Sequence, residues 1–186
     1  MRTYSKNLNP GEHGGWHTIV EGSVSSVASF DVLFRQEDWH EVVVYISEFL
    51  PSTSTENFEL LLSNNSATFA TGASAYSYSG FVADTTGTLT GFGATATNRI
   101  RCTSNNPSAA TGRENDMTFS FTNPAYAAPR TVRYEGNFYN QASGDREYFA
   151  GVGSFLNNSG ISGMRVQLDN GSNISTARYR AIGIKR

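Results

Sequence analysis

The fold class is indicated most clearly by one segment, His40-Glu41-Val42-Val43-Val44-Tyr45-Ile46-Ser47-Glu48-Phe49. Most of its residues are β-branched or aromatic, which favours an extended strand. Apolar residues occupy both alternating positions, whereas a strand with one solvated face would show them at every second position. Pro51 lacks the N–H that a sheet ladder needs and is expected to end the strand. We therefore predict that this segment lies at the centre of a sheet.

The segments before and after this strand carry a weaker signal of the same kind. In most of them, aromatic or aliphatic residues alternate with small polar ones, as in half-buried strands. The further predicted strands are 16–21, 24–30, 58–63, 75–83, 117–123, 131–139, 146–155, 161–168 and 177–185. No stretch shows the 3.6-residue period of an amphipathic helix. We predict an all-β, antiparallel, jelly-roll-like sandwich of about nine or ten strands with a short N-terminal arm.

Glycine and asparagine predict how these strands are connected. Gly22 is expected to separate the first two strands, and the Asn-Gly pair in 169–172 is expected to join the last two as a hairpin. Segment 85–97 is rich in Gly, Thr and Ala and is predicted to be a long loop or a weakly paired strand. Segment 103–115 is predicted to be a surface loop.

The length of 186 residues suits one domain. Residues 1–15 hold few apolar side chains and are predicted to be a flexible docking arm, while residues 16–186 are predicted to form a single β-sandwich domain. The N-terminus lacks the apolar region of a secretory signal, and no segment approaches the roughly 20 apolar residues of a membrane helix. We expect a soluble protein, without membrane insertion, that is made in a cytoplasm. Cys102, the single cysteine, alternates with Ile100 and is expected to be a buried small hydrophobe.

The charge distribution argues against a nucleic-acid partner. The chain has 14 basic and 16 acidic residues and a net charge of −2. Proteins that bind nucleic acids carry clustered basic residues that displace counterions from phosphates. The arginines here are scattered along the sequence, so no nucleic-acid binding is expected.

Both ends of the strand region resemble a sandwich domain found in accessory virion proteins of tailed phages. In that family a tryptophan-led strand, here 16–21, runs into a Ser/Ala-rich strand and an aromatic, here 27–30. The family closes with a glycine-led strand, a Gly-Asn-Ile turn and a final strand ending in Tyr-Gly-Ile. Segments 162–168, 170–174 and 179–185 follow this layout, although Ala181-Ile182 stands where the family has Leu-Tyr.

This resemblance implies a non-enzymatic structural protein on the virion surface, either a head decoration or spike or a tail-fibre component. Such a protein would dock by its arm and a sandwich edge, and its partners would be other capsid or tail proteins. It would be assembled in the host cytoplasm. Symmetric association predicts a homo-oligomer, with a trimer as one candidate. The alternative is a carbohydrate-binding or host-receptor-binding module that contacts a host surface glycan through exposed aromatics.

The residues that carry chemistry in enzymes and metal proteins give no strong pattern, so no cofactor and no catalytic residue are predicted. His13, His17 and His40 lack the spacing of a zinc site. The acidic pairs Asp145/Glu147 and Glu37/Asp38 are expected to be solvated turn charges, since a glycosidase needs two carboxyls in one cleft. Asp169, Asn170 and Asn173 suit either a Ca²⁺ site or a plain turn, and the turn is favoured.

Two sets of side chains are candidates for binding. Tyr76 and Tyr78 alternate on one strand and, with Tyr134, Tyr139 and Tyr148, are candidates for stacking on a glycan. The competing interpretation is that much of any alternating aromatic stripe belongs to the core. Arg165, Arg178 and Arg180 are candidates for partner contact if the last two strands pair, and solvated surface arginines are the competing interpretation.

Overall fold

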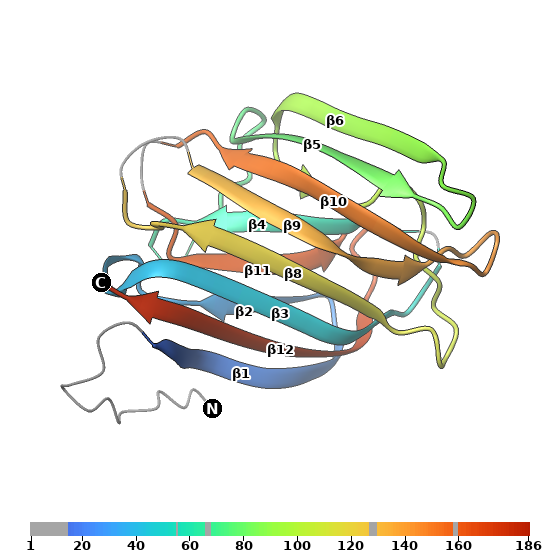
Figure 1. Ribbon diagram of the computed structural model, residues 1–186, viewed down its shortest axis with the longest axis horizontal. Helices are drawn as coiled ribbons and strands as arrows, with labels where there is room; N and C mark the ends of the chain where they lie inside the picture. Colours follow the sequence, from blue (N-terminus) through green and yellow to red (C-terminus); the bar gives the residue numbers. More distant parts are fainter. Residues whose placement is uncertain (1–14, 55, 66–67, 127–129, 158–159) are drawn as a thin grey trace.

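A computed structural model describes residues 15–54, 56–65, 68–126, 130–157 and 160–186. They form two antiparallel sheets (Figure 1), which confirms the predicted all-β sandwich. The larger sheet contains, in spatial order, β1 (Trp16–Val27), β12 (Ile174–Lys185), β3 (Trp39–Pro51), β8 (Asn115–Thr122), β9 (Arg130–Tyr139), β10 (Arg146–Phe155), β5 (Tyr76–Ala83) and β6 (Leu89–Thr97). The smaller sheet contains β2 (Ser29–Leu33), β11 (Gly163–Leu168), β4 (Phe58–Ser63) and β7 (Ile100–Arg101). A single 3₁₀ turn, Gln36–Asp38, is the helical element of the described residues.

Strand β3 has the central position that its sequence predicts. It pairs with β12 on one side and with β8 on the other. Val42 and Val44 face the second sheet, and Val43, on the opposite face, is also buried. The strand ends at Pro51, as expected.

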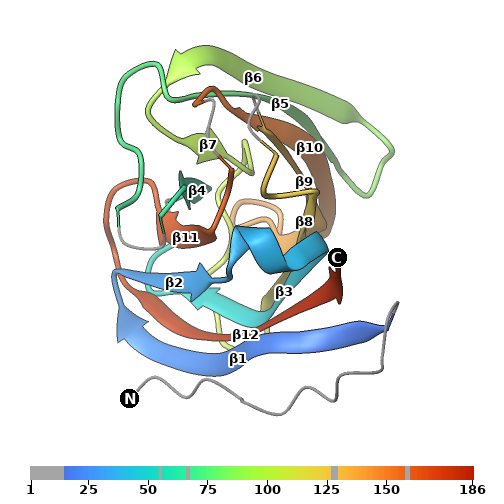
Figure 2. The same cartoon turned by 90° about the vertical axis from the view of Figure 1, so that its left-hand side faces the viewer.

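The core lies between the two sheets and is rich in aromatic rings. Figure 2 shows the larger sheet curving around the smaller one. Phe49 of β3 and Phe58 of β4 meet edge to face with ring centroids 4.6 Å apart, which joins the two layers directly. Phe30 of β2 stacks on Tyr179 of β12 at 5.3 Å. Burial of such rings supplies most of the apolar area that holds a sandwich together.

The predicted break at Gly22 is wrong. Strand β1 runs through this residue, and the chain leaves the larger sheet only after Val27. A Cβ atom at Gly22 would lie 2.7 Å from the Tyr179 hydroxyl, so the glycine provides room for that side chain instead of forming a turn. The absence of a side chain at this position has a packing reason.

The predicted hairpin between the last two strands is also wrong. Residues 168–171 form a turn, in which the Gly171 amide donates to the Leu168 carbonyl, but β11 before it pairs with β2 and β4 of the smaller sheet. Strand β12 after it pairs with β1 and β3 of the larger sheet. An Asn-Gly pair specifies a tight turn locally, and it does not decide whether the two flanking strands then pair.

Two segments predicted as loops or weak strands can now be assigned. Segment 85–97 includes β6, which pairs with β5 at the edge of the larger sheet, so of its two predicted alternatives the strand is the correct one. Segment 103–115 is not simply a surface loop, because Thr103, Ser108 and Asn115 are buried. Asn115 donates from its side chain to the carbonyl of Phe49 and accepts from the amide of Tyr139, so a polar side chain completes the backbone pairing there.

The predicted arm, residues 1–15, lies outside the described residues except for Gly15, and it stays a prediction. Strand β1 begins at Trp16, and β12 ends at Lys185. Ile100 and Cys102 are both buried, as the alternation in this segment predicts. Burial raises the pKa of the Cys102 thiol well above its ordinary value, which disfavours the reactive thiolate.

Candidate functional site

A shallow groove lies on the outward face of the larger sheet, over β3, β8, β9 and β10. These four strands are consecutive neighbours in the sheet (Figure 1). Its volume is about 330 Å³. The residues that line it are Tyr45, Ile46, Ser47, Asp116, Met117, Thr118, Glu135, Gly136, Asn137 and Tyr148. Tyr45 on β3 and Tyr148 on β10 form its two walls, with 45% and 38% of their surfaces exposed. We call this surface the sheet-face groove.

The sheet-face groove arises from strand register. Tyr45 is paired with Thr118, and Thr118 with Glu135, so these residues form one row across three strands. Asp116 is paired with Asn137, and Asn137 with Tyr148, in the next row. Three strand spacings separate β3 from β10, a distance of about 14 Å. Short side chains at the centre and large rings at both sides produce the depression.

Several polar groups of the groove are oriented by neighbouring side chains. The Tyr148 hydroxyl donates a hydrogen bond of 2.8 Å to a carboxylate oxygen of Glu135. That interaction raises the pKa of the Tyr148 hydroxyl, because loss of its proton would place a second negative charge beside Glu135. Arg146 donates to Asp116 over 3.0 Å. The groove therefore presents ordered carboxylate oxygens between two rings.

An apolar extension lies beside Tyr148. Phe81 on β5 is partly exposed, and its ring centroid is 6.2 Å from that of Tyr148. The two rings come from adjacent strands of the larger sheet. Together with Tyr45, they give the outward face an aromatic surface on both sides of its polar centre.

The two tyrosines selected from the sequence for glycan stacking are not in this groove. Tyr76 is fully buried, its hydroxyl bonds to the carbonyls of Leu62 and Ala70, and burial raises its pKa to about 12. Tyr78 is half-buried and packs against the core, 6.3 Å from the ring of Phe92. The selection of Tyr76 is therefore wrong, and Tyr78 is not available as an exposed platform. For both, the competing core interpretation is the correct one.

The wider set of tyrosines contributes one member to the groove. Tyr134 is buried, and Tyr139 is half-buried beneath Arg113 and Arg146. Tyr148 is exposed and forms a wall. Sequence reasoning did not select Tyr45, because it lies within the most apolar strand of the chain.

The three candidate arginines do not form one surface, since β11 and β12 belong to different sheets. Arg165 lies on the outer face of the smaller sheet, where it bonds both carboxylate oxygens of Asp31 at 2.7 and 3.0 Å. Arg178 pairs with Glu48 at 2.9 Å on the larger sheet, and Arg180 donates to Thr18. The expected cluster is wrong, and all three guanidinium groups already have partners within the chain.

The acidic pairs selected from the sequence lie apart from the groove. Glu147 is buried and accepts hydrogen bonds from Asn105 and Asn140, so it is not a solvated turn charge. Glu37 and Asp38 are exposed in the 3₁₀ turn. The two carboxyls that do share a depression are Asp116 and Glu135, which the sequence analysis did not select.

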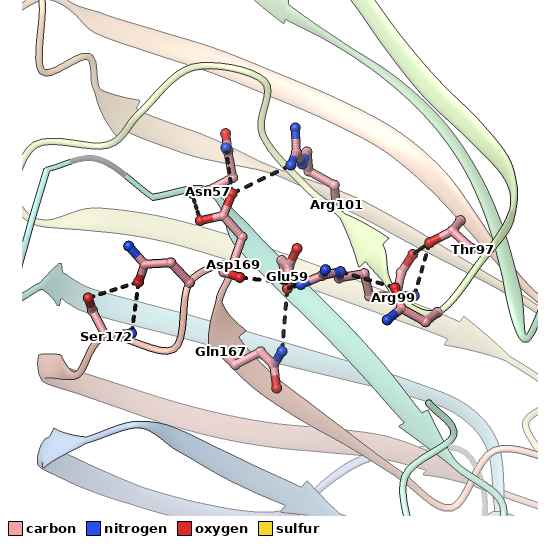
Figure 3. Close-up of polar contacts among 10 residues, drawn as sticks. Asn57, Glu59, Thr97, Arg99, Arg101, Gln167, Asp169 and Ser172 are labelled. Atoms are coloured by element: carbon pink, nitrogen blue, oxygen red, sulfur yellow. Dashed lines mark hydrogen bonds and ion pairs between the residues drawn. The ribbon is translucent and has the colours of Figure 1, made fainter. Parts of the chain in front are cut away.

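A second polar cluster closes one end of the smaller sheet (Figure 3). Glu59 on β4 is buried and accepts hydrogen bonds from Arg99 at 2.9 Å and Gln167 at 3.3 Å. Burial raises the pKa of Glu59, and the Arg99 guanidinium opposes this effect. Asp169 accepts bonds from Asn57 through both carboxylate oxygens and pairs with Arg101 at 3.5 Å. These contacts connect loops and strands, so we assign the cluster a structural role.

The part of the chain that the structure describes gives little support for a metal site. No three His, Cys, Asp or Glu side chains converge there. Asp169 is engaged by Asn57 and Arg101, and the Asn170 side chain accepts from both the amide and the hydroxyl of Ser172. These contacts describe a turn, the favoured reading of 169–172. Within the same described residues, no helix has the length and hydropathy to span a membrane.

The described residues form an all-β sandwich whose larger sheet presents an accessible, partly aromatic outward face. No protein-family model matches the sequence, and no curated protein matches it. Among solved structures, the chain is similar to the toad ovary galectin in complex with thio-digalactose, with 15% identity, 82% of this chain and 98% of that chain covered, and a TM-score of 0.34. The Caenorhabditis elegans galectin LEC-6 is 10% identical to this chain, with 84% of this chain and 94% of that chain covered and a TM-score of 0.35. A GH16 protein of Bacteroides ovatus is 7% identical, with 91% of this chain and 83% of that chain covered and a TM-score of 0.22. At these scores no function is transferred.

Proposed function

We propose that this protein is a carbohydrate-binding module and that the sheet-face groove is its binding site. One observation carries the proposal: two exposed tyrosine rings flank a row of hydrogen-bonding side chains on a regular sheet. Sugars present C–H faces that pack on aromatic rings and hydroxyls that bond to carboxylates, amides and hydroxyls. Binding sites generally combine apolar walls with a few well-placed polar groups in this way.

The geometry supports a short oligosaccharide more than a single sugar ring. The walls stand on β3 and β10, and the polar residues between them come from β8 and β9. Side chains on strands keep their spacing when a ligand arrives, because the sheet ladder fixes the backbone. The groove is therefore preorganised and needs no loop to close over a ligand.

We propose binding without catalysis. Asp116 and Glu135 share the groove, which is the minimum that a glycosidase requires. Asp116 is paired with Arg146, however, and Glu135 accepts the Tyr148 hydroxyl, so both are held as ligand-orienting acceptors. The groove is also shallow, whereas hydrolysis benefits from a site that excludes water.

The test is a glycan array followed by calorimetry with wild-type protein and alanine variants at the walls. Tyr45→Ala and Tyr148→Ala should each weaken binding about tenfold without lowering the melting temperature appreciably. Tyr126→Ala is the matched control, because Tyr126 is 60% exposed and does not line the groove. If both wall variants bind glycan with wild-type affinity, the groove is not the binding site. Release of reducing sugar from a bound oligosaccharide would refute the absence of catalysis.

We also propose that the module works on the surface of a tailed-phage virion, where it would contact a host glycan. This proposal is supported by the resemblance of residues 16–30 and 162–185 to accessory virion proteins of tailed phages. A homo-oligomer would add avidity to a shallow, weak site. Mass spectrometry of purified particles should detect the chain at a fixed copy number, and its absence from particles would refute this setting.

A further inference from the structure

We infer that the sheet-face groove selects neutral, hydroxyl-rich glycans and rejects glycans that carry carboxylate or sulfate groups. The inference rests on the proposed function and specifies its ligand class. It comes from the side-chain charges that face the groove, where carboxylates outnumber guanidinium groups. Two carboxylates, Asp116 and Glu135, line it, and only the first of them forms an ion pair with a guanidinium group among the described residues, that of Arg146.

The hydrogen-bonding capacity of the groove is mainly that of acceptors. The Glu135 carboxylate has one bond, from the Tyr148 hydroxyl, and a carboxylate accepts several. The Asp116 carboxylate likewise uses one oxygen for Arg146. Thr118 and Asn137 lie between them in the two cross-strand rows. Sugar hydroxyls are donors that match these free acceptor positions.

An acidic sugar would meet the opposite situation. A carboxylate or sulfate placed between the two walls would approach Asp116 and Glu135 without a free cation in the lining. Like charges brought together at an interface are strongly unfavourable, and such repulsion is an effective source of specificity. The arginines of β12, the strand beside β3, are engaged elsewhere: Arg178 pairs with Glu48, and Arg180 donates to Thr18 and lies 3.9 Å from the Glu21 carboxylate.

The exposed guanidinium group of Arg133, on the same sheet face, would attract an acidic ligand. Arg133 is exposed on β9, two residues from Glu135, and its cross-strand partners are Ser120 and Val152. It lies beyond the groove lining. We therefore expect acidic glycans to bind more weakly than neutral ones. Substitution of Arg133 tests whether this cation affects that preference.

The experiment compares matched glycan pairs, each a neutral oligosaccharide and the same oligosaccharide with a terminal sialic acid or a sulfate. Wild-type protein should bind the neutral member at least about tenfold more tightly. Glu135→Gln keeps the size of the side chain and removes its charge, so it should narrow this ratio. Glu37→Gln makes the same charge change at an exposed position of the 3₁₀ turn, outside the groove lining, and should leave the ratio unchanged.

The outcomes separate the two claims. If no glycan binds, the proposed function fails, and the question of charge selectivity does not arise. If glycans bind and wall substitutions abolish binding, but acidic members bind as well as neutral ones or better, the inference is overturned while the function stands. Loss of such acidic binding in Arg133→Ala would then identify the cation responsible.

Discussion

Glu59 is a buried carboxyl in the smaller sheet, and its surroundings make the stability of the fold depend on pH. Burial raises its folded-state pKa above the ordinary value of 4.5 despite the nearby Arg99. At pH values below the ordinary pKa, the carboxyl is protonated in both the folded and the unfolded state, so its ionisation does not change the free energy of unfolding. As pH rises from there toward the raised pKa, the unfolded chain loses the proton first, so the free energy of unfolding decreases. Above the raised pKa this penalty is constant.

Glu59→Gln should remove that decrease. Urea unfolding at a series of pH values, starting below 4.5, should show the variant gaining stability relative to wild type as pH rises and then keeping a constant difference. Glu37→Gln, at an exposed position in the 3₁₀ turn, is the control and should follow the wild-type pH profile. A pH profile of Glu59→Gln that runs parallel to wild type would contradict this account of the buried carboxyl.

Gly136 shows how a missing side chain supports the groove. A Cβ atom there would overlap the carbonyl oxygen of Asp116 and lie 2.8 Å from the Phe149 ring. Gly136→Ala should therefore lower the free energy of unfolding by about 1–3 kcal/mol, the usual cost of overpacking. At Gly91 on β6 the nearest atom to such a Cβ is 3.9 Å away, so Gly91→Ala should cost less in the same urea titration. Equal effects at both positions would argue against close packing at Gly136.

At the scale of the elements, the contact between β3 and β4 joins the two sheets. Phe58 is fully buried, 4.6 Å from the ring of Phe49 and 6.5 Å from that of Phe149. Phe58→Ala should cost about 3–5 kcal/mol, because it removes ring contacts and leaves a cavity. Phe81→Ala, at a partly exposed ring of β5, should cost less than about 1 kcal/mol. Similar losses in the two variants by chemical denaturation would show that the sheets are not joined mainly by this contact.

Most individual strands could be predicted from the sequence, because burial of one face imposes a period of two on the side chains. β8 alternates buried and half-buried residues along nearly its whole length, and β3 is apolar on both faces because it is central. Sheet membership could not be predicted in the same way. Strands β11 and β12 are adjacent in sequence and belong to different sheets, and only tertiary pairing decides this.

The candidate site was harder to predict for the same reason. Tyr45, Thr118 and Glu135 form one row only because β3, β8 and β9 pair in a particular register. A shift of one residue in either pairing would turn these side chains to the core. Tyr76 and Tyr148 both alternate on predicted strands, yet one is core and the other is exposed. Alternation identifies two faces, and it does not say which face meets solvent.

At the scale of the whole molecule, the sandwich separates stability from binding. The aromatic core and the polar cluster around Glu59 lie between the sheets and at the end of the smaller one, while the groove lies on the outward face of the larger sheet. Substitutions at the groove walls should therefore change affinity with little effect on folding. The curved larger sheet (Figure 2) provides the rigid support for that face.

The most direct test of glycan binding at the sheet-face groove is an NMR titration of isotope-labelled protein with the neutral oligosaccharide that binds best on the array. We predict that amide shifts concentrate on β3, β8, β9 and β10, around Tyr45, Thr118, Asn137 and Tyr148, and that they leave Leu60 and Val166 of the smaller sheet unchanged. Shifts confined to the smaller sheet or to the loops, or no shifts at saturating sugar, would contradict the account.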